Sequence, residues 1–437
     1  MFQFSYQDAL VSDQELAYFG KELMPEIERL QQAVRKEYET PYAFVNVPFD
    51  TATRDAVLKV VSAKKALNIS SLVVIGIGGS NLGALAVHEA LHGKLYNELT
   101  TGIKVYWADT IDPEQLQQQL QRVEQELAAG KRVLLNVVTK SGKTTETIVN
   151  FELFLNLLRK HRPNDYQQYV VVTTDAGSAF EAFSVDQGFT TLTIPVLVGG
   201  RYSVCTPVGL FPLALLGVDI EAFLVGAQES VPSSTDAVLF NNSAAMSALI
   251  KYLYYQQCVT IHDLFVAGPN LASFGYWYRQ LLAESIGKEL NKSSQRVEVG
   301  ITPTVSVGTI DLHSVAQLAL GGPRDKSTTF LIARRAQPAL SVPRMPEFEP
   351  LVAHIQGVPV ADIMEAISTG VQEAYRANKR PFCTITLPDL SARSLGQLMQ
   401  WCMIEMVYLG HLFDVNPFDQ PNVEAYKRET RRILEEG

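Results

Sequence analysis

The chain has 437 residues, of which 47% are hydrophobic and 19% charged, and its formal net charge is -9. This composition is that of an ordinary globular protein, long enough for two or three domains and without a disorder signature. The negative charge argues against nucleic acid as a partner, because phosphate backbones are bound by clustered basic residues. An anionic ligand must therefore meet a local positive site.

Neither the cysteines nor the apolar stretches point to an exported or membrane-bound protein. The four cysteines are far apart and form no CxxC pair, which argues against a disulfide framework and a zinc ribbon. The N-terminus lacks the basic and apolar regions of a signal peptide. The longest apolar stretch, residues 206–218, holds two prolines and is too short to span a bilayer. We expect a cytoplasmic protein with no membrane partner.

Short apolar runs rich in β-branched residues alternate with amphipathic helical patterns in the first half of the chain. Buried parallel strands are predicted at residues 71–77, 104–108, 133–138 and 169–174. The segments between them, such as "DPEQLQQQLQRVEQELAAG", predict helices. This alternation is typical of a parallel sheet wrapped by helices.

The same order of elements returns after a linker. The stretch "IHDLFVAGPNLASFGYWYRQLLAESIG" resembles "SLVVIGIGGSNLGALAVHEALHG" in its apolar strand, its turn of small residues and its helix. Further strands are predicted at residues 329–333 and 383–387. We interpret the pattern as a weak duplication of two α/β domains. Chance similarity of two strand-turn-helix units is the alternative.

The predicted organisation has five parts along the chain. They are an N-terminal helical segment (1–45), a first α/β domain (46–185), a connecting segment (186–232), a second α/β domain (233–390) and a C-terminal helical tail (391–437).

The stretch "TKSGKTTET", residues 139–147, connects the strand at 133–138 to a helix at 147–159. Its ending looks like that of an NTPase P-loop, but the first glycine of that motif is replaced by Val137. A helix start offers unpaired N–H groups and a positive dipole end. Hydroxyl groups add further donors there: Thr139, Ser141, Thr144, Thr145 and Thr147. We predict an anion site, with a plain Ser/Thr helix cap as the alternative.

Two other motifs indicate different protein classes and fail on inspection. "GIGGSNLG" has Asn81 where the dinucleotide-binding fingerprint requires its last glycine. "HEALH", residues 88–92, matches the zinc-peptidase pattern, yet its two histidines share a polar helix stripe with Asn81. We interpret that stripe as the solvated face of a helix that covers a sheet. No third metal ligand is placed nearby, so no metal is predicted.

Three residues are candidates for chemistry. A glycine pair precedes Arg201 in "VGGRYSVCTPVGL", so backbone can approach a ligand closely while the guanidinium reaches over it. Glu284 lies among aromatic residues and leucines, on the same helix side as Gln280, and is a candidate base with a raised pKa. An ordinary helix-end glutamate is the alternative. His313, taken alone, would be interpreted as a core residue.

Six motifs together resemble those of the glucose-6-phosphate isomerase family, in particular its shorter bacterial form. They are "GIGGSNLGA", "TKSGKTTET", "GGRYSVCTPVGL", "ESIGKEL", "DLHSVAQL" and "FDQPNVEAYK". The resemblance covers nearly the whole chain, from about residue 40 to the C-terminus. The resemblance implies an α/β fold with two SIS (sugar isomerase) domains, each a parallel sheet flanked by helices, and a C-terminal helical tail. It also implies reversible conversion of glucose 6-phosphate to fructose 6-phosphate, without metal or organic cofactor.

The resemblance assigns the sugar phosphate to two loops. The phosphate would be held by side chains of the two loops and one backbone N–H group: Ser80, Thr139, Ser141, Thr144 and the N–H of Lys140. Gln280 and Gln420 match positions that contact the sugar.

The chemical roles also follow from the resemblance. His313 and Lys427 would assist ring opening, and Glu284 would move a proton between C2 and C1 through a cis-enediol. Arg201 would stand beside the enediolate oxygen. The active site would lie at a homodimer interface, with His313 contributed by the neighbouring subunit.

Three positions depart from the family pattern. Lys143 replaces a usual threonine, Thr139 a usual serine, and Asn422 a usual glycine in a turn, where asparagine tolerates a left-handed conformation. A non-catalytic sugar-phosphate sensor is the alternative function. Such a sensor would keep the phosphate loop but would need neither the base nor Arg201 nor Lys427.

Overall fold

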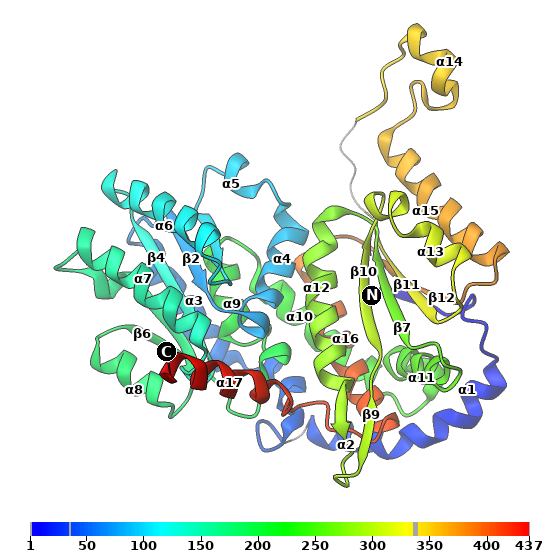
Figure 1. The fold of residues 1–437 in the computed structure, drawn as a ribbon, viewed down its shortest axis with the longest axis horizontal. Helices are drawn as coiled ribbons and strands as arrows, with labels where there is room; N and C mark the ends of the chain where they lie inside the picture. Colours follow the sequence, from blue (N-terminus) through cyan, green and yellow to red (C-terminus); the bar gives the residue numbers. More distant parts are fainter. Residues whose placement is uncertain (1, 35, 335–339, 437) are drawn as a thin grey trace.

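The computed structural model describes residues 2–34, 36–334 and 340–436. Within these ranges the chain forms two five-stranded sheets and a two-stranded ribbon. The two sheets lie side by side with helices packed between and around them (Figure 1). This is the predicted α/β architecture of two sheets flanked by helices.

The first sheet is parallel throughout and has the strand order β3-β2-β4-β5-β6. Its strands are β2 (Ser71–Ile75), β3 (Lys104–Ala108), β4 (Val133–Val138), β5 (Val170–Asp175) and β6 (Thr190–Ile194). Every residue of β2 and β4 is buried, as expected of central parallel strands covered on both faces. Helices accompany them: α3 (Thr51–Lys65), α4 (Leu82–His92), α5 (Tyr96–Leu99), α6 (Pro113–Ala128), α7 (Thr145–His161) and α8 (Ala179–Asp186).

The strand order creates a switch point between β2 and β4. The chain leaves β2 toward β3 on one side and then returns to β4 on the other side. In parallel sheets of this kind, ligands bind outside the carboxyl ends of the strands at such a point. The two loops predicted to bind phosphate follow β2 and β4, so both border the switch point.

The second sheet has the order β1-β12-β11-β7-β10. Its strands are β7 (Ile261–Val266), β10 (Thr302–Val307), β11 (Lys326–Ala333), β12 (Phe382–Leu387) and β1 (Gln3–Ser5). Four strands are parallel, but β1 pairs antiparallel with β12. Residues 3–5 are therefore an exception to the expected helical character of the N-terminal segment, which otherwise forms α1 (Asp13–Phe19) and α2 (Met24–Ala33).

Helices also surround the second sheet, and a ribbon follows one of them. The helices are α11 (Ser243–Gln256), α12 (Ala272–Ile286), α13 (Ala316–Gly321), α14 (Glu349–Val352) and α15 (Val360–Ala377). The ribbon pairs β8 (Lys288–Leu290) with β9 (Arg296–Val299) directly after α12. Figure 1 shows α14 at the end of an arm that projects from the body of the protein.

The C-terminal part contains one buried and one exposed helix. Helix α16 (Ala392–Leu412) packs closely on α10 (Ile220–Ser234), and α9 (Pro207–Leu215) precedes α10. Glycines permit this approach: a Cβ at Gly226 would lie 1.9 Å from the carbonyl oxygen of Arg393. The last helix, α17 (Val423–Glu436), has no buried residue. The five-part division of the chain stays a prediction, and α16 belongs to the core rather than to a peripheral tail.

No helix within the described ranges is long and apolar enough to cross a membrane.

Candidate active site

A carboxylate and a guanidinium meet between the two sheets. Glu284 lies in the last turn of α12, and Arg201 lies in the turn Gly200–Tyr202 that follows the first sheet. Nη1 of Arg201 donates to Oε2 of Glu284 at 3.1 Å. The side chain of Arg201 is 1% exposed and that of Glu284 27% exposed, so the carboxylate is the accessible partner.

The guanidinium of Arg201 is fixed by four further acceptors. Nε donates to the hydroxyl of Ser285 at 2.9 Å, and Nη1 also donates to Oε1 of Gln420 at 2.6 Å. Nη2 donates to the carbonyl oxygens of Pro417 and Asp419. A planar fork held along all its edges keeps one orientation, and a lysine could not reproduce it. The predicted sugar-contacting residue Gln420 is thereby brought next to the predicted base.

Gln280 lies one helical turn before Glu284 and completes this group. Its Nε2 donates to Oε1 of Glu284 at 2.9 Å, so both carboxylate oxygens have a donor. Its own Oε1 is buried and has no partner among the described residues. Gly78, at φ +59°, faces this amide, and a Cβ there would lie 3.0 Å from Nε2 of Gln280. A ligand donor at this place would satisfy the amide oxygen.

Glycines bring the loop after β2 against the Arg201 turn. A Cβ on Gly79 would lie only 2.3 Å from the carbonyl carbon of Gly200, which backbone cannot accommodate. A Cβ on Gly76 would lie 3.1 Å from the carbonyl oxygen of Val138, the last residue of β4. The loop that carries Ser80 therefore touches both the Arg201 turn and the beginning of the hydroxyl-rich loop.

The hydroxyl-rich loop keeps donors at the start of α7. Thr139 is buried, and its Oγ1 accepts from the N–H of Gly142 at 3.2 Å. Thr144 occupies the N-cap position but makes no capping hydrogen bond, unlike Ser178 at the start of α8. Ser141 is exposed. The simple helix-cap interpretation therefore fails for Thr144, whose hydroxyl and neighbouring N–H groups remain available to an anion.

The lysines of this loop are placed differently from each other. Nζ of Lys140 donates to the carbonyl oxygen of Val196 at 2.7 Å and lies 3.9 Å from the carboxylate of Asp175. The Lys140 side chain therefore holds the loop in place. Because its ammonium is engaged there, only the backbone N–H of Lys140 is a candidate ligand for the phosphate. Lys143 is exposed. Burial raises the pKa of Asp175 to about 6, and the charge of Lys140 opposes this rise.

One predicted catalytic residue lies apart from Glu284. His313 is exposed in the turn Ile310–His313 after β10. The last residue of β10, Val307, pairs with Val266, from which the chain enters α12 at Ala272. Glu284 lies twelve residues further along this helix, or about 18 Å at 1.5 Å per residue. Within one copy of the chain, His313 and Glu284 are therefore at opposite ends of α12.

The hydrogen bond of the Lys427 ammonium goes to a neighbour on its own helix. Lys427 lies on the exposed helix α17, and its ammonium pairs with Glu424 at 2.7 Å. Asn422, one of the departures from the family pattern, does not have the positive φ expected for a glycine-like turn. Its amide instead donates to Glu289 at 3.0 Å.

The predicted solvated face of the "HEALH" helix is wrong for His88 and Asn81, which are buried, whereas His92 is exposed. His88 is 2% exposed and packs against the rings of His92, Tyr96 and Trp107. Burial lowers its pKa to about 3, and the nearby His92 adds to this effect. The hydroxyl of Ser273 donates to Glu89 of the same helix. Among the described residues, no group of three or more His, Cys, Asp or Glu is arranged to hold a metal ion.

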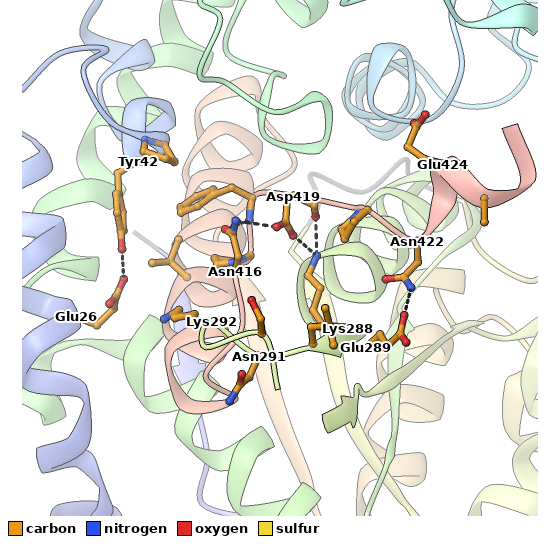
Figure 2. Close-up of a pocket in the computed structure, with 18 of the residues that line it drawn as sticks. Glu26, Tyr42, Lys288, Glu289, Asn291, Lys292, Asn416, Asp419, Asn422 and Glu424 are labelled. Atoms are coloured by element: carbon orange, nitrogen blue, oxygen red, sulfur yellow. Dashed lines mark hydrogen bonds and ion pairs between the residues drawn. The ribbon is translucent and has the colours of Figure 1, made fainter. Parts of the chain in front are cut away.

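A cavity of about 790 Å³ is lined by Lys288 and by Pro417 and Asp419. The carbonyl oxygens of the last two residues accept hydrogen bonds from Arg201. Figure 2 shows the loop with Asn416, Asp419 and Asn422 along one edge and Lys288 reaching toward Asp419. Lys288 was not predicted from the sequence. Its place four residues after Glu284, one helical turn further on, is the signal that could have indicated it.

The comparisons with known proteins identify the family of this chain. The phosphoglucose isomerase family model matches residues 59–437. A glucose-6-phosphate isomerase of Carboxydothermus hydrogenoformans is 33% identical over 407 residues, covering 91% of this chain and 86% of that protein. That of Rubrobacter xylanophilus is 34% identical over 431 residues, covering 98% and 96%.

Solved structures give the same result for the fold. The crystal structure of a hypothetical protein from Thermus thermophilus matches with a TM-score of 0.88 and 30% identity, covering 99% of this chain and 100% of that chain. A glucose-6-phosphate isomerase from Chlamydia trachomatis matches with a TM-score of 0.82 at 20% identity, covering 99% and 88%, which supports the fold. The family model matches most of the chain, and both relatives exceed 30% identity over most of their length, so this chain belongs to the phosphoglucose isomerase family.

Proposed function

We propose that this chain interconverts glucose 6-phosphate and fructose 6-phosphate, and that Glu284 is the base that carries the proton between C2 and C1. The contact between Arg201 and Glu284 carries this proposal. It puts a fixed cation beside the accessible carboxylate, where negative charge develops on the enediolate oxygen during proton transfer. Family membership supports the substrate and the reaction.

The phosphate of the sugar would occupy the switch point of the first sheet. Its ligands would be Ser80, the hydroxyls of Thr139, Ser141 and Thr144, and the N–H group of Lys140. The uncapped start of α7 and its free hydroxyl at Thr144 support this assignment. Gln280 and Gln420 would contact the sugar on either side of Glu284, since both belong to the hydrogen-bonded group around it.

The reaction begins with opening of the sugar ring, which we assign to His313 and Lys427. Glu284 then removes the proton from C2 of the open aldose, which gives a cis-enediolate with its charge on O1. A proton passes from O2 to O1, and Glu284 returns its own proton to C1 to give the ketose. A positioned carboxylate base typically contributes about 10²- to 10⁴-fold in rate. The residues named here perform each step, and we expect no cofactor.

We further propose a homodimer in which His313 of one subunit serves the site of the other. The position of His313 at the opposite end of α12 from Glu284 supports this arrangement. Exposed apolar residues also flank it, with Ile310 at 63%, Val315 at 42% and Leu318 at 51% exposure. Such a patch is typical of a protein–protein contact. We expect the dimer to act in the cytoplasm.

Turnover of fructose 6-phosphate tests the function. The glucose 6-phosphate formed is followed by NADP reduction with glucose-6-phosphate dehydrogenase, in wild type and Glu284→Gln. We expect rapid wild-type turnover and a loss of about 10²-fold or more in the variant, with sugar-phosphate binding retained. Glu289→Gln, a change on the nearby ribbon, serves as the control and should keep full activity. Binding without wild-type turnover would favour a sugar-phosphate sensor instead.

A further inference from the structure

One lysine makes hydrogen bonds both to Glu284 and to the loop of residues 416–422, which holds Arg201. Lys288 begins the ribbon strand β8 and is 6% exposed, although it lines the 790 Å³ cavity. Burial lowers the pKa of its ammonium, while the carboxylate of Asp419 counteracts this effect. The mechanism proposed above gives this residue no role.

The ammonium of Lys288 has three acceptors for its three donors. Nζ donates to the carbonyl oxygen of Glu284 at 2.7 Å and to that of Asp419 at 2.6 Å. It also lies 3.1 Å from Oδ1 of the Asp419 carboxylate. Figure 2 shows the lysine extended along the cavity wall toward Asp419, which Asn416 holds from the other side at 2.9 Å. The side chain therefore ties the end of α12 to the loop.

One carbonyl group joins this lysine to the arginine. The carbonyl oxygen of Asp419 accepts from Lys288 and also from Nη2 of Arg201, at 3.0 Å. The next residue, Gln420, accepts from Nη1 of the same arginine. A shift of the loop would therefore move the arginine and Gln420 relative to the carboxylate of Glu284. Without the ammonium, the carbonyl oxygen of Asp419 keeps only its arginine donor, and the carbonyl oxygen of Glu284 loses its bond to the lysine. The loop then has no hydrogen bond from this side chain to the end of α12, so we expect it to shift.

We propose that Lys288 is a positioning residue of the isomerase reaction, an inference that rests on the proposed function. It sets the distance between Glu284, on one side, and the pair of Arg201 and Gln420, on the other. It touches neither the sugar nor the phosphate. Misplacement by about 1 Å costs on the order of 10²-fold in rate, so the effect belongs in kcat.

The first experiment compares Lys288→Met with Lys292→Met. Both lysines line the same cavity, but Nζ of Lys292 makes no hydrogen bond or ion pair with a described residue. We expect kcat of Lys288→Met to fall about 10- to 100-fold. Its Kd for sorbitol 6-phosphate, which has the phosphate but no carbonyl, should change less than about threefold, because that phosphate is bound at the first sheet. Lys292→Met should match wild type in both.

Chemical rescue gives a second readout that a merely structural role would not produce. In Lys288→Ala, the cavity offers small amines a path to the vacated ammonium site. Ethylammonium should raise kcat several-fold and saturably, whereas ethanol at the same concentration should not. Wild type and Lys292→Ala should not respond to either compound.

Wild-type kcat in a folded Lys288→Met, or loss of sorbitol 6-phosphate binding in parallel with kcat, would overturn the inference. If that variant is unfolded, Lys288→Gln decides, because its neutral and shorter side chain cannot reach the carbonyl oxygens of Glu284 and Asp419 together. Lower kcat with unchanged binding supports the inference, and wild-type kcat overturns it. Absence of turnover in wild type itself would instead refute the proposed function, so the two failures are distinguishable.

Discussion

The guanidinium of Arg201 gives Glu284 only one of its N–H groups, across 3.1 Å, and directs the others to Ser285 and to the loop after Val415. Its orientation is therefore determined by neutral oxygens rather than by the carboxylate. When a proton moves to or from Glu284, the arginine keeps its place. A donor that does not reorganise during the reaction is the kind that stabilises a developing charge most effectively.

Replacement of this arginine by lysine should therefore lower the rate of the reaction strongly. Arg201→Lys keeps the charge but loses the fork, and we expect kcat to fall about 100-fold, or about 3 kcal/mol in the barrier. Steady-state kinetics with fructose 6-phosphate measure this. Tyr202→Phe is the control, since its hydroxyl contacts Pro417 and Ser285 but not Glu284. Near-normal kcat in Arg201→Lys would contradict the role.

Thr144→Val should weaken substrate binding without weakening the protein. The hydroxyl does not cap α7, so its loss costs no helix-cap hydrogen bond. We expect KM to rise about 10-fold or more, as for loss of one hydrogen bond to a charged group, with kcat nearly unchanged. The matched control is Asp219→Ala, which removes a real cap from α10 and should cost about 1 kcal/mol of stability without changing KM. An unchanged KM in Thr144→Val would remove this residue from the phosphate site.

Mixing two inactive variants tests whether His313 acts across a dimer. Glu284→Gln and His313→Ala are each expected to be inactive. If subunits exchange at random, half of the dimers are mixed and each has one intact site, so activity should return to about a quarter of wild type. Subunits mixed after unfolding and refolding together are compared with refolded single variants. If the histidine acts within its own chain, mixing restores nothing.

The buried His88 should make the protein sensitive to acid. Its pKa is about 3 in the folded state and near 6.5 when unfolded, so protons bind the unfolded chain more strongly between these values. Its contribution to stability is complete above about pH 6.5 and declines as pH falls toward 3, by about 2 kcal/mol between pH 7 and pH 5.

His88→Leu should remove this part of the pH dependence. Urea unfolding of wild type and variant at pH 7 and pH 5 measures the difference. His92→Leu, a change to the exposed neighbour, should alter the slope less. An equal loss of stability in wild type and His88→Leu would show that other groups cause the acid sensitivity.

The sequence predicted the central strands better than the edge strands, for a physical reason. β2 and β4 are covered on both faces, so their residues are apolar except Ser71 and Asn136. β6 and β10 are outer strands of their sheets, and their sequences "TTLTI" and "TPTVSV" are half polar. Neither has the continuous apolar run of a buried strand; both alternate polar and apolar residues, and Pro303 weakens the strand prediction for β10.

The site shows the same division between local pattern and distant contact. The motifs around Arg201 and Glu284 were visible in sequence, and the structure brings these two residues together. The link from Lys288 to Asp419 spans 131 positions, and no periodicity encodes it. The burial of His88 was missed because a helical wheel shows which residues share a face, but not which rings cover that face.

The antiparallel strand β1 has a consequence for synthesis of the chain. All strands of the first sheet lie between residues 71 and 194, so that sheet can close while the ribosome is still translating the second half. β1 pairs with residues 384–386 and must stay unpaired until they emerge. The outer edge of β12 is thus sealed by a strand made long before it. An N-terminal fusion that hinders residues 3–5 would leave that edge open to pairing between nascent or finished chains, and so to aggregation.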